Sequence, residues 1–264
     1  LVKEAEDLAK QGVKELILVA QETTVYGQDL YGEKSLPRLL RELCKIQGIW
    51  WIRLLYCYPE EVDEELIQVM KEEPKICHYI DLPIQHASDE ILKRMGRRTS
   101  RAELVEIIGK LREAIPDIAI RTTLITGFPG ETKEQQEELM DFVDQMEFDR
   151  LGVFTYSPEE DTPAARMPDQ IPEEVKEDRK AQLMELQQEI AFDRAEQMKG
   201  REMLVLIEGK VADENAYVGR TYMDAPGVDG LIFVQTEEEL MTGDFVKVKV
   251  TGALEYDLIG EVLR

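Results

Sequence analysis

The sequence predicts an α/β protein that ends in a small antiparallel β-barrel. Over residues 1–170, short apolar runs alternate with amphipathic helical patterns, which is typical of parallel strands joined by crossover helices. Several prolines then interrupt this pattern, and a connecting helix is predicted over residues 171–199. Residues 200–264 hold short strand patterns separated by turns. We therefore expect two domains joined by one long helix.

The first domain is predicted to contain five parallel strands. Their apolar runs are short and several are continuous, which indicates strands buried on both faces. They are expected at residues 16–19, 50–56, 78–84, 118–126 and 151–156. Helices are expected before and between these strands at residues 2–10, 36–46, 88–95 and 101–114, after Asp63, and after Thr132. Thr132 forms a capping-box pair with Gln135. A closed barrel needs eight such units, so the pattern predicts an open or partial barrel, or a doubly wound sheet.

The last 65 or so residues are predicted to form a barrel of the OB-like size class. Strand patterns occur at residues 204–207, 231–234, 246–250 and 258–263. Turn signals such as Pro226-Gly227 and Thr242-Gly243-Asp244 separate them. Four or five short strands in so few residues favour a small antiparallel barrel.

The composition indicates an acidic cytoplasmic protein. The net charge of −23 disfavours loose binding to phosphate backbones and favours a basic partner. No apolar run approaches the ~20 residues of a membrane span, and no leader precedes the first helical pattern. The chain begins at Leu1 inside that pattern, so we expect a fragment of a longer protein. Cys44, Cys57 and Cys77 lack the spacing of metal ligands and are expected to be buried thiols.

The strongest local signal lies at residues 121–132, where a strand leads through a Gly-Phe-Pro-Gly turn into a capped helix. Glycines in such a turn allow a ligand to approach the backbone closely. No lysine follows in the position that a phosphate-binding P-loop requires. Two interpretations stand at this point, a ligand site and a plain tight turn.

Polar residues at other strand ends could join this site. Arg121 and Thr123 share one face of their strand, and a buried arginine needs an anionic partner. That partner is either a ligand carboxylate or one of the chain's own acids. The runs at residues 21–24 and 81–86 follow two other strands, although each could be an ordinary polar loop. His78 and His86 are far apart along one strand, which favours structural roles over a shared metal.

Seven blocks in order resemble the methylthiotransferase family of radical S-adenosylmethionine (SAM) enzymes. They are residues 21–32 (QETTVYGQDLYG), 51–59 (WIRLLYCYP), 79–88 (YIDLPIQHAS), 91–95 (ILKRM), 121–132 (RTTLITGFPGET), 148–156 (FDRLGVFTY) and 162–167 (TPAARM). Residues 224–230 (DAPGVDG) and 255–260 (EYDLIG) resemble the TRAM domain that ends such proteins. The resemblance covers nearly the whole chain.

The resemblance implies a partial barrel of the radical SAM type with six strands, the first of which is absent here. It also implies a CxxxCxxC loop after that strand and a preceding domain, which carry two [4Fe–4S] clusters in the full-length protein. The cysteines of this sequence do not replace those ligands. We therefore expect this chain to bind no cluster and to be catalytically inert by itself, and we assign no catalytic residue within it.

The resemblance also implies where SAM lies. Gln21, Glu22 and Thr23 would lie by its amino group, and Arg121 and Thr123 would hold its carboxylate or ribose. The turn would pack on the adenosine. The full set of expected cofactor-binding residues is Gln21, Glu22, Thr23, Gln85, Arg121, Thr123, Gly127, Gly130 and Glu131.

The blocks are most similar to the branch that modifies an aspartate of the small-subunit ribosomal protein twelve. The alternative, MiaB-like branch modifies an adenosine of tRNA. Residues 200–264 contain six basic and thirteen acidic residues, a net charge of −7, which favours a basic ribosomal protein over tRNA. An electron donor for the cluster is a further expected partner. A non-catalytic RNA- or protein-binding fragment, and a SAM-dependent or nucleotide-binding barrel enzyme without a cluster, are the other hypotheses.

Overall fold

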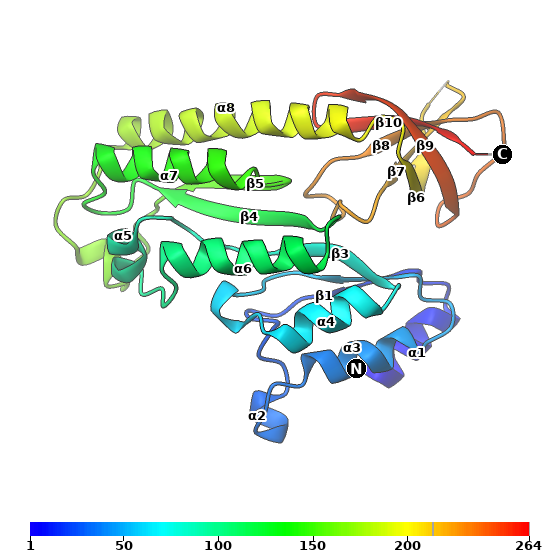
Figure 1. The fold of residues 1–264 in the computed structure, drawn as a ribbon, viewed down its shortest axis with the longest axis horizontal. Coiled ribbons are helices and arrows are strands. Elements are labelled where there is room, and N and C mark those ends of the chain that lie inside the picture. Colours follow the sequence, from blue (N-terminus) through cyan, green and yellow to red (C-terminus); the bar gives the residue numbers. More distant parts are fainter. Residues whose placement is uncertain (213, 264) are drawn as a thin grey trace.

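Five parallel strands follow one another across the larger domain in chain order (Figure 1). The computed structural model describes residues 1–212 and 214–263. The strands are β1 (Glu15–Leu18), β2 (Trp51–Leu54), β3 (Ile76–Asp81), β4 (Ala119–Thr126) and β5 (Arg150–Thr155). The predicted open sheet of five strands is confirmed.

The five strands differ from their predicted bounds by one to three residues, and β3 differs most. The strand expected at residues 78–84 begins at Ile76 and ends at Asp81. Pro83 has no N–H to give to a ladder, so the regular pairing ends before it. Beyond it, Gln85 resumes a single parallel bridge with Leu124 of β4.

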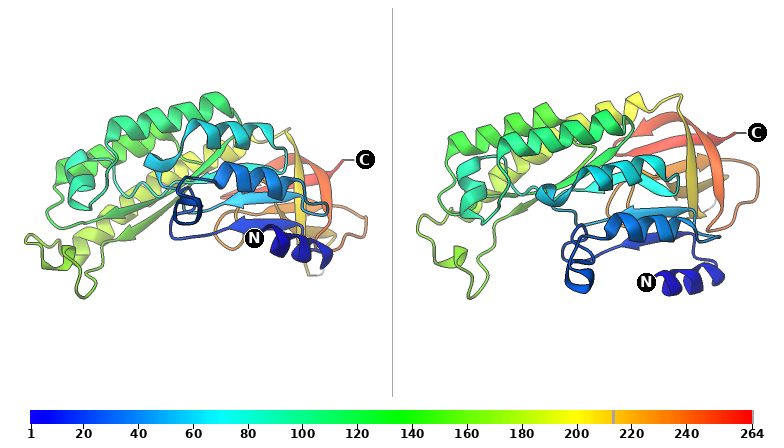
Figure 2. Two further views of the ribbon diagram at one scale, coloured as in Figure 1. Left: turned by 90° about the horizontal axis from the view of Figure 1, so that it is seen from below. Right: turned by 60° about the horizontal axis from the view of Figure 1, so that its bottom comes forward.

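Helices cover one face of this curved sheet (Figure 2). They are α1 (Val2–Lys10), α3 (Leu36–Cys44), α4 (Glu64–Glu72), α5 (Asp89–Arg94), α6 (Arg101–Ala114) and α7 (Lys133–Met146), with 3-10 turns at Pro59–Glu61 and Ala164–Arg166. The short helix α2 (Gln28–Tyr31) projects away from the sheet (Figure 1). The capping box of Thr132 and Gln135 starts α7 as predicted. On the face toward the helices, side chains such as Ile52, Ile80 and Leu124 are completely buried. Alternate residues of each strand therefore face away from the helices.

The second domain is a closed barrel of five strands. The long helix α8 (Glu173–Gln197) leads to β6 (Glu202–Lys210), β7 (Ala216–Arg220), β8 (Ile232–Gln235), β9 (Phe245–Leu254) and β10 (Asp257–Val262). The small barrel is confirmed, but its description as purely antiparallel is wrong in one respect. β8 and β10 pair in parallel, because the order around the barrel is β10-β8-β7-β6-β9.

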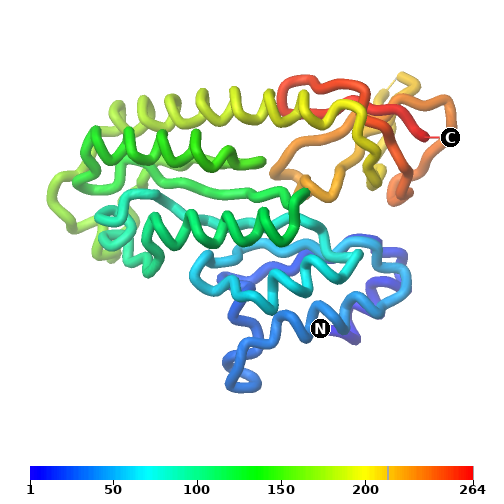
Figure 3. Tube along the Cα trace, in the orientation of Figure 1, coloured from blue at the N-terminus to red at the C-terminus, as the bar shows by residue number. Residues whose placement is uncertain are grey.

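The barrel is attached at the amino ends of the sheet strands. The segment between β7 and β8, residues 221–231, runs against β3 and β4 on the face opposite to the helices (Figure 3). Trp51 at the start of β2 packs edge-on against Phe245 of β9, with ring centroids 4.9 Å apart. The carboxyl ends of the strands lie at the other edge of the sheet. Among the described residues, no helix is long and apolar enough to cross a membrane.

Candidate functional site

The Gly-Phe-Pro-Gly turn at the carboxyl end of β4 is held by one buried carboxylate. Gly127 and Gly130 have φ angles of 72° and 75°, which glycine adopts without strain. The Glu131 carboxylate accepts hydrogen bonds from the backbone N–H groups of Gly127, at 2.8 Å, and Phe128, at 3.3 Å. Glu131 is only 3% exposed. Its side chain therefore shapes the turn from inside.

Side chains of helix α8 pack against this turn. Arg179 pairs with Glu131 at 2.7 Å, and the stem of buried Lys176 crosses Gly127 so closely that a Cβ there would collide with its Cγ. A Cβ at Gly130 would likewise meet the Arg94 guanidinium. The space that the two glycines leave is therefore occupied by the chain's own side chains. Gly127 is buried and Gly130 is partly buried, so only Gly130 keeps some surface for a ligand.

The loop after β1 ties the ends of two strands together. The Thr23 hydroxyl donates to the Leu55 carbonyl at 2.6 Å, and its N–H donates to the Tyr56 carbonyl at 2.9 Å. The Glu22 carboxylate accepts from the N–H of Tyr58 at 3.0 Å and from Thr24. Gln21 is exposed. Of the three residues predicted here, Gln21 has the side chain most accessible to a ligand.

Gln85 presents a buried acceptor near the carboxyl end of β3. Its backbone, at φ 72°, bridges to β4 by bonds to the Thr123 carbonyl and the Ile125 N–H. Its side-chain Oε1 is buried without a partner among the described residues. A buried acceptor without a donor costs about 1–3 kcal/mol, so this oxygen is suited to a donor on a ligand. Gln85, Thr123 and the turn thus share one edge of the sheet.

The two histidines contact structural groups. The His86 Nδ1 atom accepts from the Ser88 N–H at 2.9 Å, and its Nε2 lies 3.6 Å from the Glu131 carboxylate. His78 contacts Asp117 at 2.7 Å on the far side of the sheet. His78 thus has a partner within the chain, whereas the buried Nε2 of His86 has no hydrogen-bond partner among the described residues.

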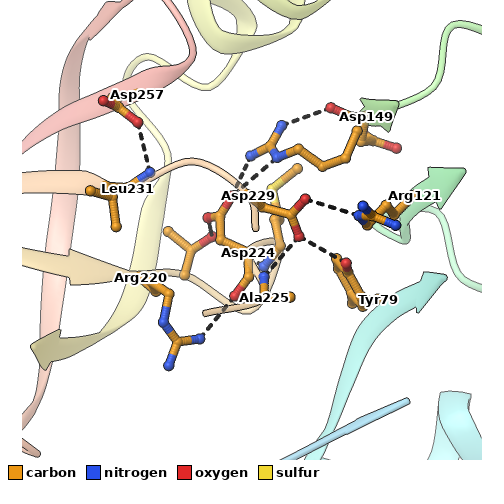
Figure 4. Close-up of polar contacts among 12 residues, drawn as sticks. Tyr79, Arg121, Asp149, Arg220, Asp224, Ala225, Asp229, Leu231 and Asp257 are labelled. Atoms are coloured by element: carbon orange, nitrogen blue, oxygen red, sulfur yellow. Dashed lines mark hydrogen bonds and ion pairs between the residues drawn. The ribbon is translucent and has the colours of Figure 1, made fainter. Parts of the chain in front are cut away.

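Arg121 has carboxylate partners within the chain. Its guanidinium lies 2.8 Å from Asp81. It also lies 3.4 Å from Asp229, which comes from the barrel domain (Figure 4). Asp229 also accepts from the Tyr79 hydroxyl at 2.8 Å. Burial is the largest single influence and lowers the pKa of Arg121, but Asp81, Tyr79 and Asp229 together outweigh it and raise that pKa. The structural ion pair, one of the two predicted alternatives, is therefore present, and a ligand carboxylate would have to compete with these acids.

Further buried charges join the two domains, and the sequence did not single them out. Arg53 of β2 contacts Glu15 of β1 at 2.8 Å, and Glu15 also accepts from Arg220 at 2.6 Å. Arg150 of β5 pairs with Asp224. The available signal was the presence of charged residues inside otherwise apolar strands, which require partners.

The three cysteines do not form a metal site. Cys57 and Cys77 are buried and Cys44 is partly buried, and burial raises the pKa of all three thiols. No group of three or more His, Cys, Asp or Glu side chains among the described residues could hold a metal ion. These residues therefore do not fit an iron–sulfur cluster. The carboxyl edge of the sheet, with the unpartnered Gln85 acceptor and the exposed Gln21, does fit a small polar cofactor.

The parallel, open β/α sheet with a glycine turn after β4 is the arrangement that the comparisons with known families must explain. The family model for the radical SAM superfamily matches residues 1–143, and the model for the TRAM domain matches residues 200–263. The chain belongs to the radical SAM superfamily.

Curated relatives narrow this class further. The chain is 66% identical over 260 residues to "Ribosomal protein uS12 methylthiotransferase RimO" of Lachnoclostridium phytofermentans, covering 98% of this chain and 59% of that protein. The protein of the same name from Desulfitobacterium hafniense is 52% identical over 264 residues, which cover 100% of this chain and 59% of the relative. The chain thus spans about three fifths of the length of these relatives.

Solved structures agree on the fold. Coproporphyrinogen III oxidase (HemN) from Escherichia coli, a radical SAM enzyme, matches with a TM-score of 0.52 at 17% identity, over 76% of this chain and 48% of that chain. Methylornithine synthase (PylB) matches with a TM-score of 0.50 at 15% identity, over 71% of this chain and 53% of that chain. At these identities the likeness concerns the fold alone.

Proposed function

We propose that this chain is the SAM-binding and TRAM part of a methylthiotransferase that adds a methylthio group to an aspartate of ribosomal protein uS12. The observation that carries this proposal is the 66% identity to a relative of that name over nearly the whole chain. The open carboxyl edge of the sheet supports it, since ligands of parallel β/α folds bind there.

The residues proposed to hold SAM are those whose polar groups remain available at this edge. The buried Gln85 Oε1 would accept a hydrogen bond from the cofactor's amino or ribose group. Gln21 and Thr123 would add polar contacts, and the backbone at Gly130 would pack on the adenosine. When bound, SAM would supply the adenosyl radical and the methyl group of the reaction.

Other residues of the expected set would act on the shape of the site. Glu131 would hold the turn, because its carboxylate accepts two backbone N–H groups of that turn. Glu22 and Thr23 would hold the loops after β1 and β2 against each other. Arg121 would fix Asp81 and Asp229 rather than a ligand.

The cluster ligands are proposed to lie in the remainder of the full-length protein. Among the described residues, β1 pairs only with β2. A groove of about 270 Å³, lined mostly by apolar residues including Leu8, Leu16 and Val19, runs beside β1. This unpaired edge is suited to a further strand. We expect anaerobic reconstitution of this chain with iron and sulfide to give neither a stoichiometric cluster nor SAM cleavage; a stoichiometric cluster would contradict the proposal.

Charge favours the ribosomal protein over tRNA as substrate. A domain that grips tRNA normally presents basic residues, because neutralised phosphates supply much of the affinity. The TRAM domain has thirteen acidic and six basic residues instead. Such a domain suits a basic ribosomal protein and a place in the cytoplasm beside the ribosome. A reductant for the clusters would be a second partner.

The test uses the full-length protein with reconstituted clusters. Binding to purified uS12 and to tRNA is measured across a salt series, and both are offered as substrates with SAM. We expect salt-sensitive binding to uS12 and a mass increase of one methylthio group on it. Tighter binding to tRNA, with modification of an adenosine, would instead assign the chain to the tRNA branch.

A further inference from the structure

Tyr56 stands out at the carboxyl end of β2. Its φ angle is 56°, in the left-handed region, and its side chain is 47% exposed. A bulky residue with this backbone is a genuine outlier, whereas glycine would adopt it without strain. Strained residues of this kind cluster at sites that bind or act on ligands. The strained backbone of Tyr56 thus holds its ring exposed to solvent at the carboxyl edge of the sheet.

Both peptide groups of Tyr56 are held. Its N–H donates to Oδ2 of Asp81 at 3.0 Å, and its carbonyl accepts from the Thr23 N–H at 2.9 Å. These bonds come from β3 on one side and from the loop after β1 on the other. The left-handed conformation is therefore fixed by its surroundings and does not depend on the ring.

Asp81 links Tyr56 to the TRAM domain. While Oδ2 accepts from Tyr56, Oδ1 accepts from Arg121 at 2.8 Å. Arg121 in turn lies 3.4 Å from Asp229 in the segment between β7 and β8 (Figure 4). Asp81 and Asp229 have side chains only 4% and 3% exposed, so the linkage is shielded from water.

The same edge of the sheet exposes another large side chain. Phe154, near the end of β5, is 59% exposed. β2, which Tyr56 follows, and β5 are three strand spacings apart, or roughly 14 Å along the sheet at ~4.8 Å per spacing. A rim of that width is better suited to a polypeptide than to one small cofactor. Exposed aromatic residues are also the usual anchors of protein–protein contacts.

We propose that Tyr56 contacts the target protein and determines specificity for it, and that Asp81, anchored through Arg121 to Asp229, is the residue that positions it. This inference rests on the proposed function, because it takes uS12 as the target. In this arrangement the TRAM domain, through Asp229, holds the substrate-facing edge of the sheet in place.

The first test compares variants of the full-length protein. Tyr56→Ala should raise the KM and Kd for purified uS12 about ten-fold or more, the loss expected for an aromatic anchor, and change the Kd for SAM less than about two-fold. Tyr56→Phe should retain most of the affinity. The matched control is Tyr31→Ala, which removes a tyrosine that is 52% exposed on α2. Loss of SAM affinity in place of uS12 affinity would overturn the proposal.

The second test examines the positioning role. The Asp81 carboxylate accepts from two donors at once, whereas an asparagine offers one acceptor oxygen, so Asp81→Asn must lose one bond. In this chain we expect the amide NMR signal of Tyr56 to shift and its hydrogen exchange to quicken. The control is the Tyr58 N–H, which donates to Glu22 at 3.0 Å and should not change.

The two residues should also act as a unit on substrate binding. Asp81→Asn should raise the KM for uS12 in the wild-type background and add little in the Tyr56→Ala background. Full additivity would overturn the positioning role. If the wild-type protein does not bind uS12, the proposed function fails as well. If it binds uS12 and Tyr56→Ala binds equally well, only this inference fails.

Discussion

Replacing Arg53 with leucine should loosen the attachment of the TRAM domain to the sheet. Arg53 lies on β2 and its side chain is fully buried. Its guanidinium contacts Glu15 at 2.8 Å and donates to the Tyr222 carbonyl of the TRAM domain at 2.6 Å. It also lies 4.7 Å from the centre of the Tyr79 ring. One side chain therefore joins two strands of the sheet to the second domain.

The expected loss follows from what leucine leaves behind. The Tyr222 carbonyl loses its charged donor, and a buried acceptor without a donor costs about 1–3 kcal/mol. Glu15 keeps only Arg220, and breaking a buried pair from one side typically costs ~3–5 kcal/mol. Both terms involve the same guanidinium and overlap, so we expect a total of about 3–5 kcal/mol. The control Arg41→Leu breaks an exposed pair with Glu65 and should cost less than about 1 kcal/mol.

Urea denaturation followed by two signals measures this loss. Trp50 and Trp51 are the only tryptophans of the chain, and both rings pack on Phe245 with centroids 4.9 Å apart. Tryptophan fluorescence therefore reports the contact between the domains, while far-ultraviolet circular dichroism reports mainly the helices. In Arg53→Leu the fluorescence midpoint should fall and should precede the dichroism midpoint. A loss no larger than that of Arg41→Leu would refute the reasoning.

Three further predictions concern the turn, the thiols and pH. Gly127→Ala should lower the melting temperature more than Gly12→Ala, because both have positive φ but only the first places a Cβ against another side chain. At pH 8 the native thiols should resist Ellman's reagent until urea is added, since burial raises the pKa of Cys44 and Cys77 to about 12; rapid native labelling would contradict this. Burial raises the pKa of Asp229, so the folded state binds a proton more tightly than the unfolded state. The stability of the wild type relative to Asp229→Asn should therefore increase as pH falls through that raised value toward 3.8. Denaturation at several pH values measures this difference, and a difference that does not change with pH would contradict the prediction.

The elements with strong local signals could be predicted from the sequence. The helix after Thr132 was placed correctly because both its capping residues and its apolar stripe lie within one stretch of chain. β7 (Ala216–Arg220) was missed because Gly219 interrupts its apolar pattern, and its stability comes from pairing with β6 and β8. The parallel pairing of β8 with β10 likewise depends on closure of the barrel, which no local pattern encodes.

The sequence located the candidate site, but it did not determine the role of each residue in it. The sequence placed Gly127 beside a possible ligand, but it could not reveal that Lys176 crosses that glycine from α8. Arg121 needed an anionic partner on physical grounds, and both alternatives were left open. Only the tertiary structure brings Asp81 and Asp229 to it. Which acid meets which arginine is a non-local property in a chain with 55 acidic residues.

The interface between the domains also bears on the charge argument for a protein substrate. Asp224 and Asp229 are buried against Arg150 and Arg121, so these two acids cannot attract a basic partner. Arg220 is buried as well, between Glu15 and Glu208, so it cannot bind phosphate. Among the described residues of the TRAM domain, nine acidic and four basic residues remain outside these buried pairs. The excess of acid therefore persists on the accessible surface, and if uS12 is the substrate, its binding should weaken as salt concentration rises.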